Sequence, residues 1–536
     1  MLRRAWKPAL VVTPVAAAGY YYYTSRQQQT FDLPVRIRGP DGKASMSTRT
    51  LPLMTMAAVD ARIRENASAH SVSRPGIMWR HSTASVAAND PLEDATAHQV
   101  IRRDEGDGDL LFFTVMDGHG GYYTSQLLSR VLINAVVLQL NDLSNPKPSS
   151  WLDGIKTALW GPLTSKSNSD VDIHIAPTPN PTSAKASSPA ANPRLVARAI
   201  QTAFTALDAE LLAAPVRVLA AALHDTPKDS TAIPDLSQHP LAQPTMLPAM
   251  TGSCALLALL DTAHRNLYVA CTGDSRAVAG VWEPDAEGNG TWRVEVLSED
   301  QTGRNPAEAA RMRSEHPADE AADVIRNGRV LGGLEPSRAF GDARYKWSRA
   351  LQETLARAFL NGSMRAPPLL LKTPPYVTAC PVVTHRVLEL PPSDVKTKGA
   401  LRFIVLATDG LWDELSSEDV VRLVGGHLAG LTGAIPKSDL PSLVPTTAGA
   451  RTVQGKAALR ARDGEGKEAG KWAFVDANPS AHLIRNAFGG ANEGALRRLL
   501  SIPAPLARRH RDDVSVTVVW WEEGGEAEVA QVKAKL

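Results

Sequence analysis

Short apolar segments with the composition of buried β-strands recur along this chain, and several of them lie next to an aspartate. A buried strand is a rigid support, so a carboxylate at its end can be aimed at a metal ion. The sequence therefore predicts a metal-binding protein built on buried strands. Four aspartates share this position at a strand end: Asp117 after 110–116, Asp274 after 267–272, Asp409 after 403–408 and Asp512 before 514–521.

The neighbours of these aspartates favour metal ligation over simple turns. An isolated Asp-Gly pair is usually a turn, but glycine follows both Asp117 and Asp409, with His119 and Trp412 close behind. Glycine beside the acid lets the backbone approach an ion and leaves a carbonyl oxygen free as a ligand. Because these are oxygen ligands and the sequence shows no Cys or His cluster, Mg²⁺ or Mn²⁺ is favoured over zinc.

The periodicity of the remaining segments predicts a mixed α+β fold. Segments 254–260 and 267–271 have the pattern of a β-hairpin. Aliphatic residues at helical spacing predict helices over 122–140, 195–212 and 419–428. Strands outnumber β–α–β alternations, so this class is favoured over a doubly wound parallel sheet. Hydrophobic residues make up 43% of the chain, which is enough for a substantial core.

Three stretches interrupt this dense pattern. Residues 145–192, 227–248 and 433–470 are rich in Pro, Gly, Ser, Asn or Thr and show little apolar periodicity. We expect them to be loop insertions within one domain over 51–525. A C-terminal tail is expected over 526–536.

The N-terminus differs from the rest of the chain. Four basic residues precede the first acid, Asp32, and residues 9–23 are almost wholly apolar. This composition predicts a mitochondrial targeting segment over 1–50, leading to the matrix or the intermembrane space. The apolar run is shorter than the roughly 20 residues of a spanning helix. A retained inner-membrane anchor and a disordered tail are the alternatives.

Charge and cysteine usage exclude other classes. The 58 Lys and Arg residues against 56 Asp and Glu leave a net charge of +2 without a long basic run. We therefore expect no nucleic-acid partner, and a metal-dependent nuclease is disfavoured because it needs a basic groove. The scattered Cys254, Cys271 and Cys380 predict neither a disulfide scaffold nor a zinc site, and they fit a reducing compartment.

Cys380 and Arg386 have the Cys-x5-Arg spacing of cysteine-dependent phosphatases. That chemistry needs a glycine-bearing loop whose amides hold phosphate at a helix N-terminus. The intervening residues here are mostly proline and β-branched, and 387–390 continues as a strand. We therefore interpret the spacing as coincidence.

Six segments together resemble, in order, the signature segments of the type 2C metal-dependent protein serine/threonine phosphatases. The resemblance spans roughly residues 89–521. It implies a two-sheet antiparallel β-sandwich flanked by helices, with a pair of Mg²⁺ or Mn²⁺ ions in a cleft at one end. The matching segments are 88–94, 117–121, 273–276, 337–342, 407–413 and 511–513.

The resemblance also implies a ligand for each ion. One ion would be held by Asp117, Asp409 and Asp512, and the other by Glu93, Asp117 and the carbonyl of Gly118, with Asp94 orienting bound water. Acids matching Asp274 and Asp342 line a weaker third-metal region in the family.

The implied reaction is hydrolysis of phosphoserine and phosphothreonine on proteins. Two ions sharing Asp117 would bridge a water, lower its pKa and supply hydroxide for in-line attack on phosphorus. His119 is the candidate general acid for the leaving oxygen, and its alternative role is a structural hydrogen bond. A catalytically inactive phosphatase fold that binds or regulates is the alternative function, but the retained acid set argues against it.

Further segments resemble the mitochondrial pyruvate dehydrogenase phosphatase branch of this family, in agreement with the predicted import segment. The resemblance implies that the phosphoprotein substrate is the E1 subunit of the pyruvate dehydrogenase complex. The segments are 329–334, 338–342, 345–348, 373–379 and 481–485.

One position departs from the general family. Many type 2C phosphatases carry an arginine four residues before the Glu of the Glu-Asp pair, where it grips the substrate phosphate. That position here is Asn89, as in the pyruvate dehydrogenase phosphatase branch. We expect the ions to hold the phosphate and protein–protein contacts to select the substrate. The alternative is a basic residue from the loops near Arg80 or Arg338.

Overall fold

The computed structural model describes residues 29–38, 44–102, 108–144, 192–224, 232–285, 290–388, 400–447 and 470–523. The apolar run 9–23, most of the insertion 145–192 and the tail 526–536 lie outside these residues. In the part of the chain that the structure describes, no helix is long and apolar enough to cross a membrane.

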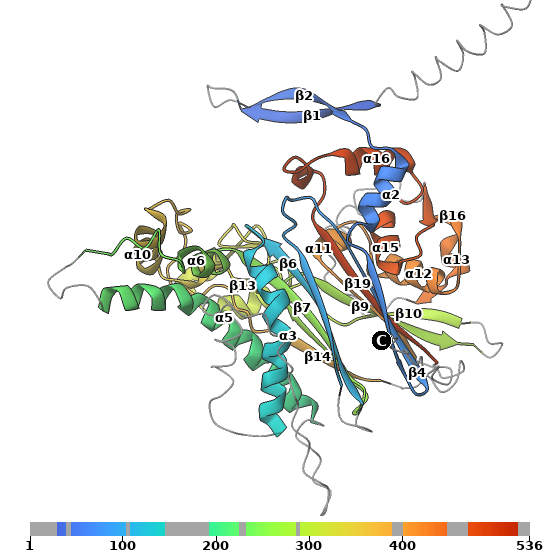
Figure 1. Ribbon diagram of the computed structural model, residues 1–536, viewed down its shortest axis with the longest axis horizontal. Helices are drawn as coiled ribbons and strands as arrows, with labels where there is room; N and C mark the ends of the chain where they lie inside the picture. The colour runs from blue at the N-terminus through green and yellow to red at the C-terminus, as the bar shows by residue number, and fades with distance from the viewer. Residues whose placement is uncertain are drawn as a thin grey trace, which may run out of the picture.

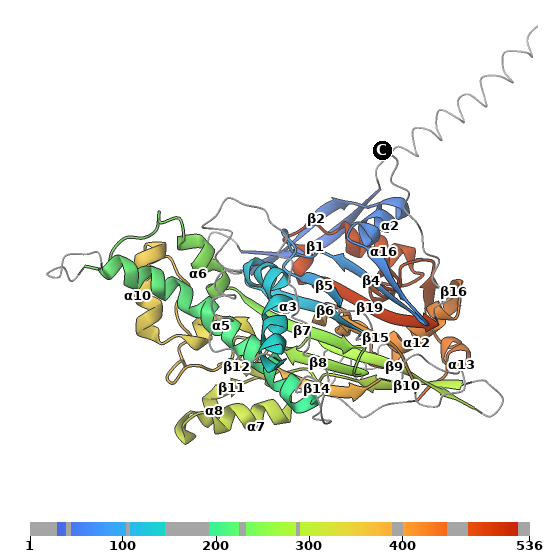
Figure 2. The ribbon, with the colours of Figure 1, turned by 60° about the horizontal axis from the view of Figure 1, so that its bottom comes forward.

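Two sheets lie face to face and form a β-sandwich (Figures 1 and 2). Adjacent strands are antiparallel except β10 and β17. The first sheet has the order β17-β10-β9-β15-β19-β4-β3, with β3 (Ser68–Arg74), β4 (Ile77–Val86), β9 (Arg276–Pro284), β10 (Gly290–Val296), β15 (Ala400–Ala407), β17 (Thr446–Thr447) and β19 (Val514–Glu523). The second has the order β14-β8-β7-β6-β5, with β5 (Ala95–Arg102), β6 (Asp109–His119), β7 (Gly252–Asp261), β8 (Asn266–Thr272) and β14 (Val382–Val387), and β13 (Phe340–Gly341) pairs with β7.

Alternate residues of each strand fill the space between the sheets. On β6, Leu111, Phe113 and Val115 belong to this inner core, whereas Leu110 and Phe112 belong to the core under the helices. This alternation follows from the two-residue period of a strand that is covered on both faces. The seven-stranded sheet contributes Trp79, Val281, Ile404, Leu406 and Val519 to the same inner core.

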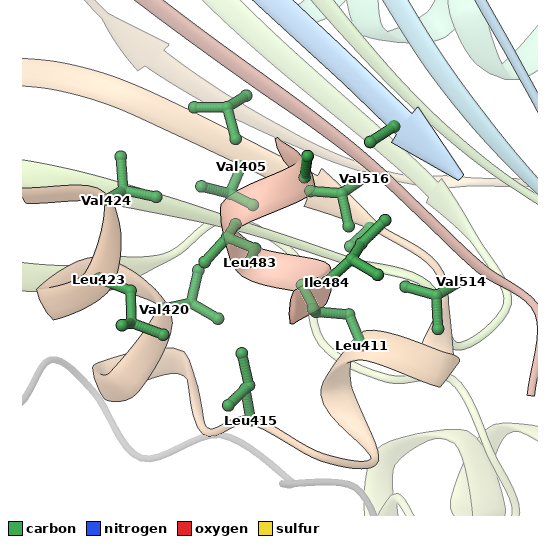
Figure 3. Close-up of a cluster of buried hydrophobic side chains, with 14 of the residues drawn as sticks. Val405, Leu411, Leu415, Val420, Leu423, Val424, Leu483, Ile484, Val514 and Val516 are labelled. Carbon is green, nitrogen blue, oxygen red and sulfur yellow. The ribbon is translucent and has the colours of Figure 1, made fainter. Parts of the chain in front are cut away.

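Helices cover the outer face of each sheet, as the α+β prediction requires. Helices α3 (Tyr123–Ser144) and α5 (Pro193–His224) pack on the six-stranded sheet. The predicted helices 122–140 and 195–212 are thereby confirmed, although α5 continues to His224. The helices α2 (Met56–Arg64), α11 (Asp409–Trp412), α12 (Ser417–Leu428) and α15 (Pro479–Ala487) lie on the seven-stranded sheet. Figure 3 shows side chains of α11, α12 and α15 in one core cluster with side chains of β15 and β19.

Smaller elements complete the fold. The helices are α6 (Ala242–Met250), α7 (Pro306–Ser314), η2 (Ala318–Glu320), α8 (Ala321–Val324), α9 (Ala343–Lys346), α10 (Arg349–Leu360), α13 (Leu440–Leu443), α16 (Glu493–Ser501) and η3 (Ala507–Arg509). The strands are β1 (Thr30–Arg38), β2 (Ala44–Pro52), β11 (Ile325–Arg326), β12 (Arg329–Val330), β16 (Gly433–Pro436) and β18 (Lys471–Phe474).

Two expected loops contain regular structure. Helix α6 occupies the end of 227–248 and buries Met246 against Leu211 and Phe359, so the loop prediction is wrong there. Its first proline, Pro244, lies in the first helical turn, where a missing N–H breaks no helical hydrogen bond. The described part of 433–470 likewise holds β16, α13 and β17.

The boundary expected at residue 50 falls inside a folded hairpin. Strands β1 and β2 pair from Thr30 to Pro52. Leu33 and Leu51 are buried against Ile502 and Ala507. The β1–β2 hairpin is thus held by hydrophobic contacts with residues far along the chain, although its sequence was assigned to the predicted targeting segment.

Candidate metal centre

The aspartates at the strand ends converge at one end of the sandwich. Asp117 lies near the end of β6, Asp274 lies between β8 and β9, and Asp409 follows β15. The candidate ligand oxygens of these three residues all lie within 4.8 Å of one another. The structure thus gathers three of the predicted acids in one group, and Asp274, matched by resemblance to a third-metal acid, lies beside Asp117 and Asp409.

Strand pairing explains this convergence. Ala407, the last residue of β15, pairs with Arg276 on β9 and with Val516 on β19. Asp274 and Asp512 lie just before those two strands, so antiparallel register brings them to the end of β15. From the other sheet, Asp117 pairs with Cys254, whose thiol donates a hydrogen bond to Asp274 at 3.1 Å.

Asp512 is held by a basic residue that the sequence analysis did not identify. The guanidinium of Arg508 forms an ion pair with Asp512 Oδ2. Burial lowers the pKa of Arg508, but Asp512, Asp409 and Asp117 outweigh it and raise that pKa. The positive charge of Arg508 is therefore close enough to interact with Asp409 and Asp117 as well as with Asp512. A run of basic residues directly before an Asp-Asp pair is the sequence signal that could have indicated it.

Glu93 and Asp94 lie on the loop between β4 and β5. Asp94 is 1% exposed, and Thr408 Oγ1 donates a hydrogen bond to its Oδ2 at 2.9 Å. This contact ties the loop directly to the residue before Asp409. Glu93 is half-buried and accepts a hydrogen bond from Asn89 Nδ2 at 3.3 Å.

Asp513 shapes the same loop and was also missed as a functional residue. Its Oδ1 accepts from the backbone N–H of Asn89 at 2.9 Å, and its Oδ2 accepts from the N–H of Glu93 at 2.9 Å. Asn89 Nδ2 also donates to Asp513 Oδ2, at 3.0 Å. Of the adjacent pair, Asp513 thus fixes the loop while Asp512 lies toward the acidic group.

Gly118 is required by the close approach of two backbone segments. A Cβ at this position would collide with the carbonyl oxygen of Glu93. Ser125 Oγ donates a hydrogen bond to that same carbonyl. The glycine therefore lets the Glu93 loop lie against the end of β6, which brings Glu93 and Asp117 to the same site.

Electrostatics show how unfavourable these charges are without a cation. Burial raises the pKa of Asp117, and the carboxylates of Asp409, Asp94 and Asp274 raise it further. Burial, followed by repulsion from Asp513 and Asp512, raises the pKa of Asp94. Burial also raises the pKa of Asp274 to about 6. A divalent cation would relieve this repulsion.

His119 is paired with Asp342, not left free in its turn. The His119 Nε2 and Asp342 Oδ2 atoms lie 2.7 Å apart. Burial opposes the charged imidazole, but Asp342 outweighs burial and raises the pKa of His119. Asp342, expected near a third metal, thus contacts the candidate general acid and is absent from the group of Asp117, Asp274 and Asp409.

The basic residues considered as substitutes for the missing arginine are engaged elsewhere. Arg338 donates to both carboxylate oxygens of Glu308 and to the carbonyl of Cys380. Arg80 forms an exposed ion pair with Glu522. Arg386 pairs with Glu295 from strand β14, so the Cys380 spacing does not form a phosphate-binding loop.

A buried arginine, Arg276, joins the segment that contains Asp274 to the helix that begins at Asp409. Arg276 donates to Asp300 Oδ1 at 2.8 Å and to Oδ2 at 2.6 Å. Its guanidinium lies 4.9 Å from the ring centroid of Trp412. This arrangement fixes the segment that follows Asp274 against the helix that begins at Asp409.

The donor set fits hard divalent cations. The residues at the site offer carboxylate oxygens and the backbone of Gly118, and oxygen donors are the ligands that Mg²⁺ and Mn²⁺ prefer. The raised carboxylate pKa values and the closely packed glycine agree with a built cation site.

Comparisons with known proteins identify the same family as the sequence motifs. A family model described as Protein phosphatase 2C matches residues 205–434. A protein phosphatase 2C homolog of Schizosaccharomyces pombe is 34% identical over 89% of this chain and 88% of its own. Mitochondrial [pyruvate dehydrogenase [acetyl-transferring]]-phosphatase 1 of Saccharomyces cerevisiae is 32% identical over 90% of this chain and 75% of its own. The corresponding phosphatase 2 of Homo sapiens is 32% identical over 83% and 78%.

A β-sandwich with an acidic group at one end, together with these relatives, defines a metal-dependent protein serine/threonine phosphatase. The chain belongs to the protein phosphatase 2C family. It is therefore a hydrolase of a family that uses Mg²⁺ or Mn²⁺, and its substrates are phosphoproteins.

Proposed function

We propose that this phosphatase dephosphorylates the E1 subunit of the pyruvate dehydrogenase complex in mitochondria. The observation that carries the site is the convergence of Asp117, Asp274 and Asp409 from separate strand ends. The substrate proposal is supported by two relatives whose names specify pyruvate dehydrogenase phosphatase activity, at 32% identity over most of this chain.

The proposed cation ligands are the residues gathered at this end of the sandwich. When bound, the cations supply activated water for attack and positive charge against the phosphate. Asp94 is buried beside Thr408, which suits a residue that orients water. The proposed ligands are Glu93, Asp94, Asp117, the Gly118 carbonyl, Asp409 and Asp512, and Asp274 is an additional candidate.

His119 is the proposed proton donor to the departing serine or threonine oxygen. The Asp342 carboxylate favours the protonated imidazole and fixes its orientation. A protonated, oriented donor lowers the barrier to departure of a poor alkoxide leaving group. Asp342 is then a positioning residue, and Gly252 provides the space in which the pair lies.

Arg508 is the proposed substitute for the arginine that Asn89 replaces. The side chain of Asn89 donates hydrogen bonds to Asp513 and Glu93. Arg508, in contrast, faces the acidic group and is partly exposed. A guanidinium can bind two phosphate oxygens at once. Competition between Asp512 and phosphate for this side chain should leave small esters weakly bound.

The experiment compares kcat/KM for three substrates: p-nitrophenyl phosphate, a short phosphoserine peptide and phosphorylated pyruvate dehydrogenase E1. Assays contain Mn²⁺, Mg²⁺ or a chelator, and Asp409→Asn serves as the background control. We expect metal-dependent activity on all three and a large advantage for the intact protein. Equal kcat/KM for the small ester and for E1 would refute selection through protein–protein contacts.

The mitochondrial location is tested separately. Because the folded hairpin begins at Thr30, the proposed targeting segment is confined to the residues before it. These residues should carry a fluorescent reporter into mitochondria, and replacing Arg3, Arg4 and Lys7 by Glu should abolish import. Carbonate extraction of the imported protein then distinguishes a retained anchor from a cleaved leader. A reporter that stays in the cytosol contradicts the proposal.

A further inference from the structure

Three histidines that are scattered in the sequence meet at one edge of the sandwich. His70 is on β3, His81 is on β4 and His98 is on β5. Their candidate ligand nitrogens all lie within 4.8 Å of one another. The ring centroids of His81 and His98 are 4.3 Å apart, and those of His70 and His81 are 5.0 Å apart.

The topology makes this group a bridge between the two sheets. Strand β3 is the edge of the seven-stranded sheet, and β5 is the edge of the six-stranded sheet. His70 and His81 are direct partners in the β3–β4 ladder, so their side chains share a face. His98 faces them from the other sheet.

His81 has the properties of a metal ligand without a metal. It is 4% exposed, and its Nε2 has no hydrogen-bond partner among the described residues. Burial and the neighbouring His98 and His70 lower the pKa of His81 to about 3, so the ring is neutral at physiological pH. A buried imidazole nitrogen without a partner is costly, and a cation would satisfy it.

We propose that His70, His81 and His98 bind one Zn²⁺ ion that joins the edges of the two sheets. Imidazole nitrogen suits zinc, and three histidines with solvent in the fourth position form a common tetrahedral site. Tetrahedral bonds of 2.0–2.1 Å place ligand nitrogens roughly 3.3 Å apart. Small rotations of the exposed His70 and His98 side chains can close the remaining distance.

This site is separate from the carboxylate centre. His98 pairs with Phe113 on β6, and Asp117 lies four residues further along that strand, roughly 13 Å away at 3.3 Å per residue. The ligand chemistry also differs, since the carboxylates favour hard cations and the imidazoles favour zinc. Strands β4 and β5 flank the loop that carries Glu93 and Asp94, so zinc would fix the base of that loop.

Zinc binding is measured by calorimetry on the full chain after metal removal, with excess Mg²⁺ present to occupy the carboxylates. We expect one Zn²⁺ per chain in the wild type and in the control His239→Asn, whose side chain is exposed. His98→Asn and His70→Asn should each weaken that binding by more than about a hundredfold, because loss of a direct ligand exceeds the 10- to 100-fold cost of removing a supporting contact.

Cobalt substitution identifies the geometry independently of activity. Bound Co²⁺ should give the intense visible bands of a tetrahedral site in the wild type and in Asp409→Asn, but not in His98→Asn. Zn²⁺ should also raise the melting temperature by a few degrees only where all three histidines remain. Unchanged zinc affinity in His98→Asn, or cobalt bands that disappear in Asp409→Asn, would overturn the proposal.

Discussion

His119 Nε2 lies 2.7 Å from Asp342 Oδ2, across 223 residues of sequence. This pair joins the end of β6 to the residue after β13, and it sits beside the carboxylate group. The alternatives for His119 were a catalytic acid and a structural hydrogen bond. A carboxylate that favours the charged imidazole is the environment that a proton donor requires.

Replacing His119 should therefore affect substrates according to their leaving groups. His119→Asn is expected to lower kcat/KM for a phosphoserine peptide by about 10²- to 10³-fold. The loss for p-nitrophenyl phosphate should be much smaller, because p-nitrophenolate departs without a proton. Steady-state kinetics with both substrates provide the measurement. Equal losses would assign His119 a structural role instead.

The space around this pair can be tested by adding one carbon. A Cβ at Gly252 would collide with His119 Nε2 and lie 2.5 Å from Asp342 Oδ2. Gly252→Ala should thus displace the imidazole and lower phosphopeptide turnover by at least about tenfold. Gly494→Ala is the control, since its added Cβ meets Asn492 Oδ1 at an ordinary 3.5 Å. Full activity of Gly252→Ala would show that the position of His119 is not critical.

Removing one central carboxylate should weaken metal binding while the protein still folds. Asp409→Asn is expected to fold and to lose turnover by several orders of magnitude. In the wild type, Mn²⁺ should raise the melting temperature, because it binds the native state and relieves carboxylate repulsion. That rise should be small or absent in Asp409→Asn. A variant that keeps full turnover would falsify the metal-site assignment.

Arg508 should contribute to binding of the substrate phosphate. We expect Arg508→Ala to raise KM for phosphopeptide by about tenfold or more, the typical value of a lost charge-assisted contact. Arg509→Ala, in the same short helix η3, is the matched control. If both variants retain wild-type KM, the phosphate is held by the cations and other groups alone.

A prediction about stability concerns the buried ion pair between Glu308 and Arg338, which is not part of the candidate metal centre. Glu308 is 5% exposed, and although burial opposes its charge, Arg338 and Arg311 lower its pKa to about 2. A folded pKa below the unfolded value contributes stability above about pH 4.5, and this contribution is lost as the pH falls toward 2. The contribution at pH 7 is about 3 kcal/mol.

Glu308→Gln should accordingly lower the free energy of unfolding by several kcal/mol at pH 7, because it also leaves Arg338 buried without its carboxylate. The difference from the wild type should shrink as the pH falls from 5 toward 3. Urea denaturation across this range gives the measurement, and Glu315→Gln, at the exposed C-cap of the same helix, is the control. A difference that does not change with pH would contradict the assigned pKa.

The sequence alone determined the elements that carry the acids. Asp117 and Asp409 follow runs of apolar residues, and both the strands and the neighbouring glycines can be read within a few residues of each acid. Helical periodicity likewise predicted α3 and α12. These features are local, because strand and helix periods depend on the chemistry of adjacent residues.

Tertiary structure decided which of these residues meet. Antiparallel register, and not spacing along the chain, brings Asp274 to Asp409. It also places Asp342 against His119, and it gathers His70, His81 and His98 although the sequence showed no histidine cluster. The first turn of α6 tolerates Pro244 because a backbone N–H at that position would have no helical partner in any case. The β1–β2 hairpin is held by Ile502 and Ala507. Such contacts depend on the folded path of the chain, so no local pattern specifies them.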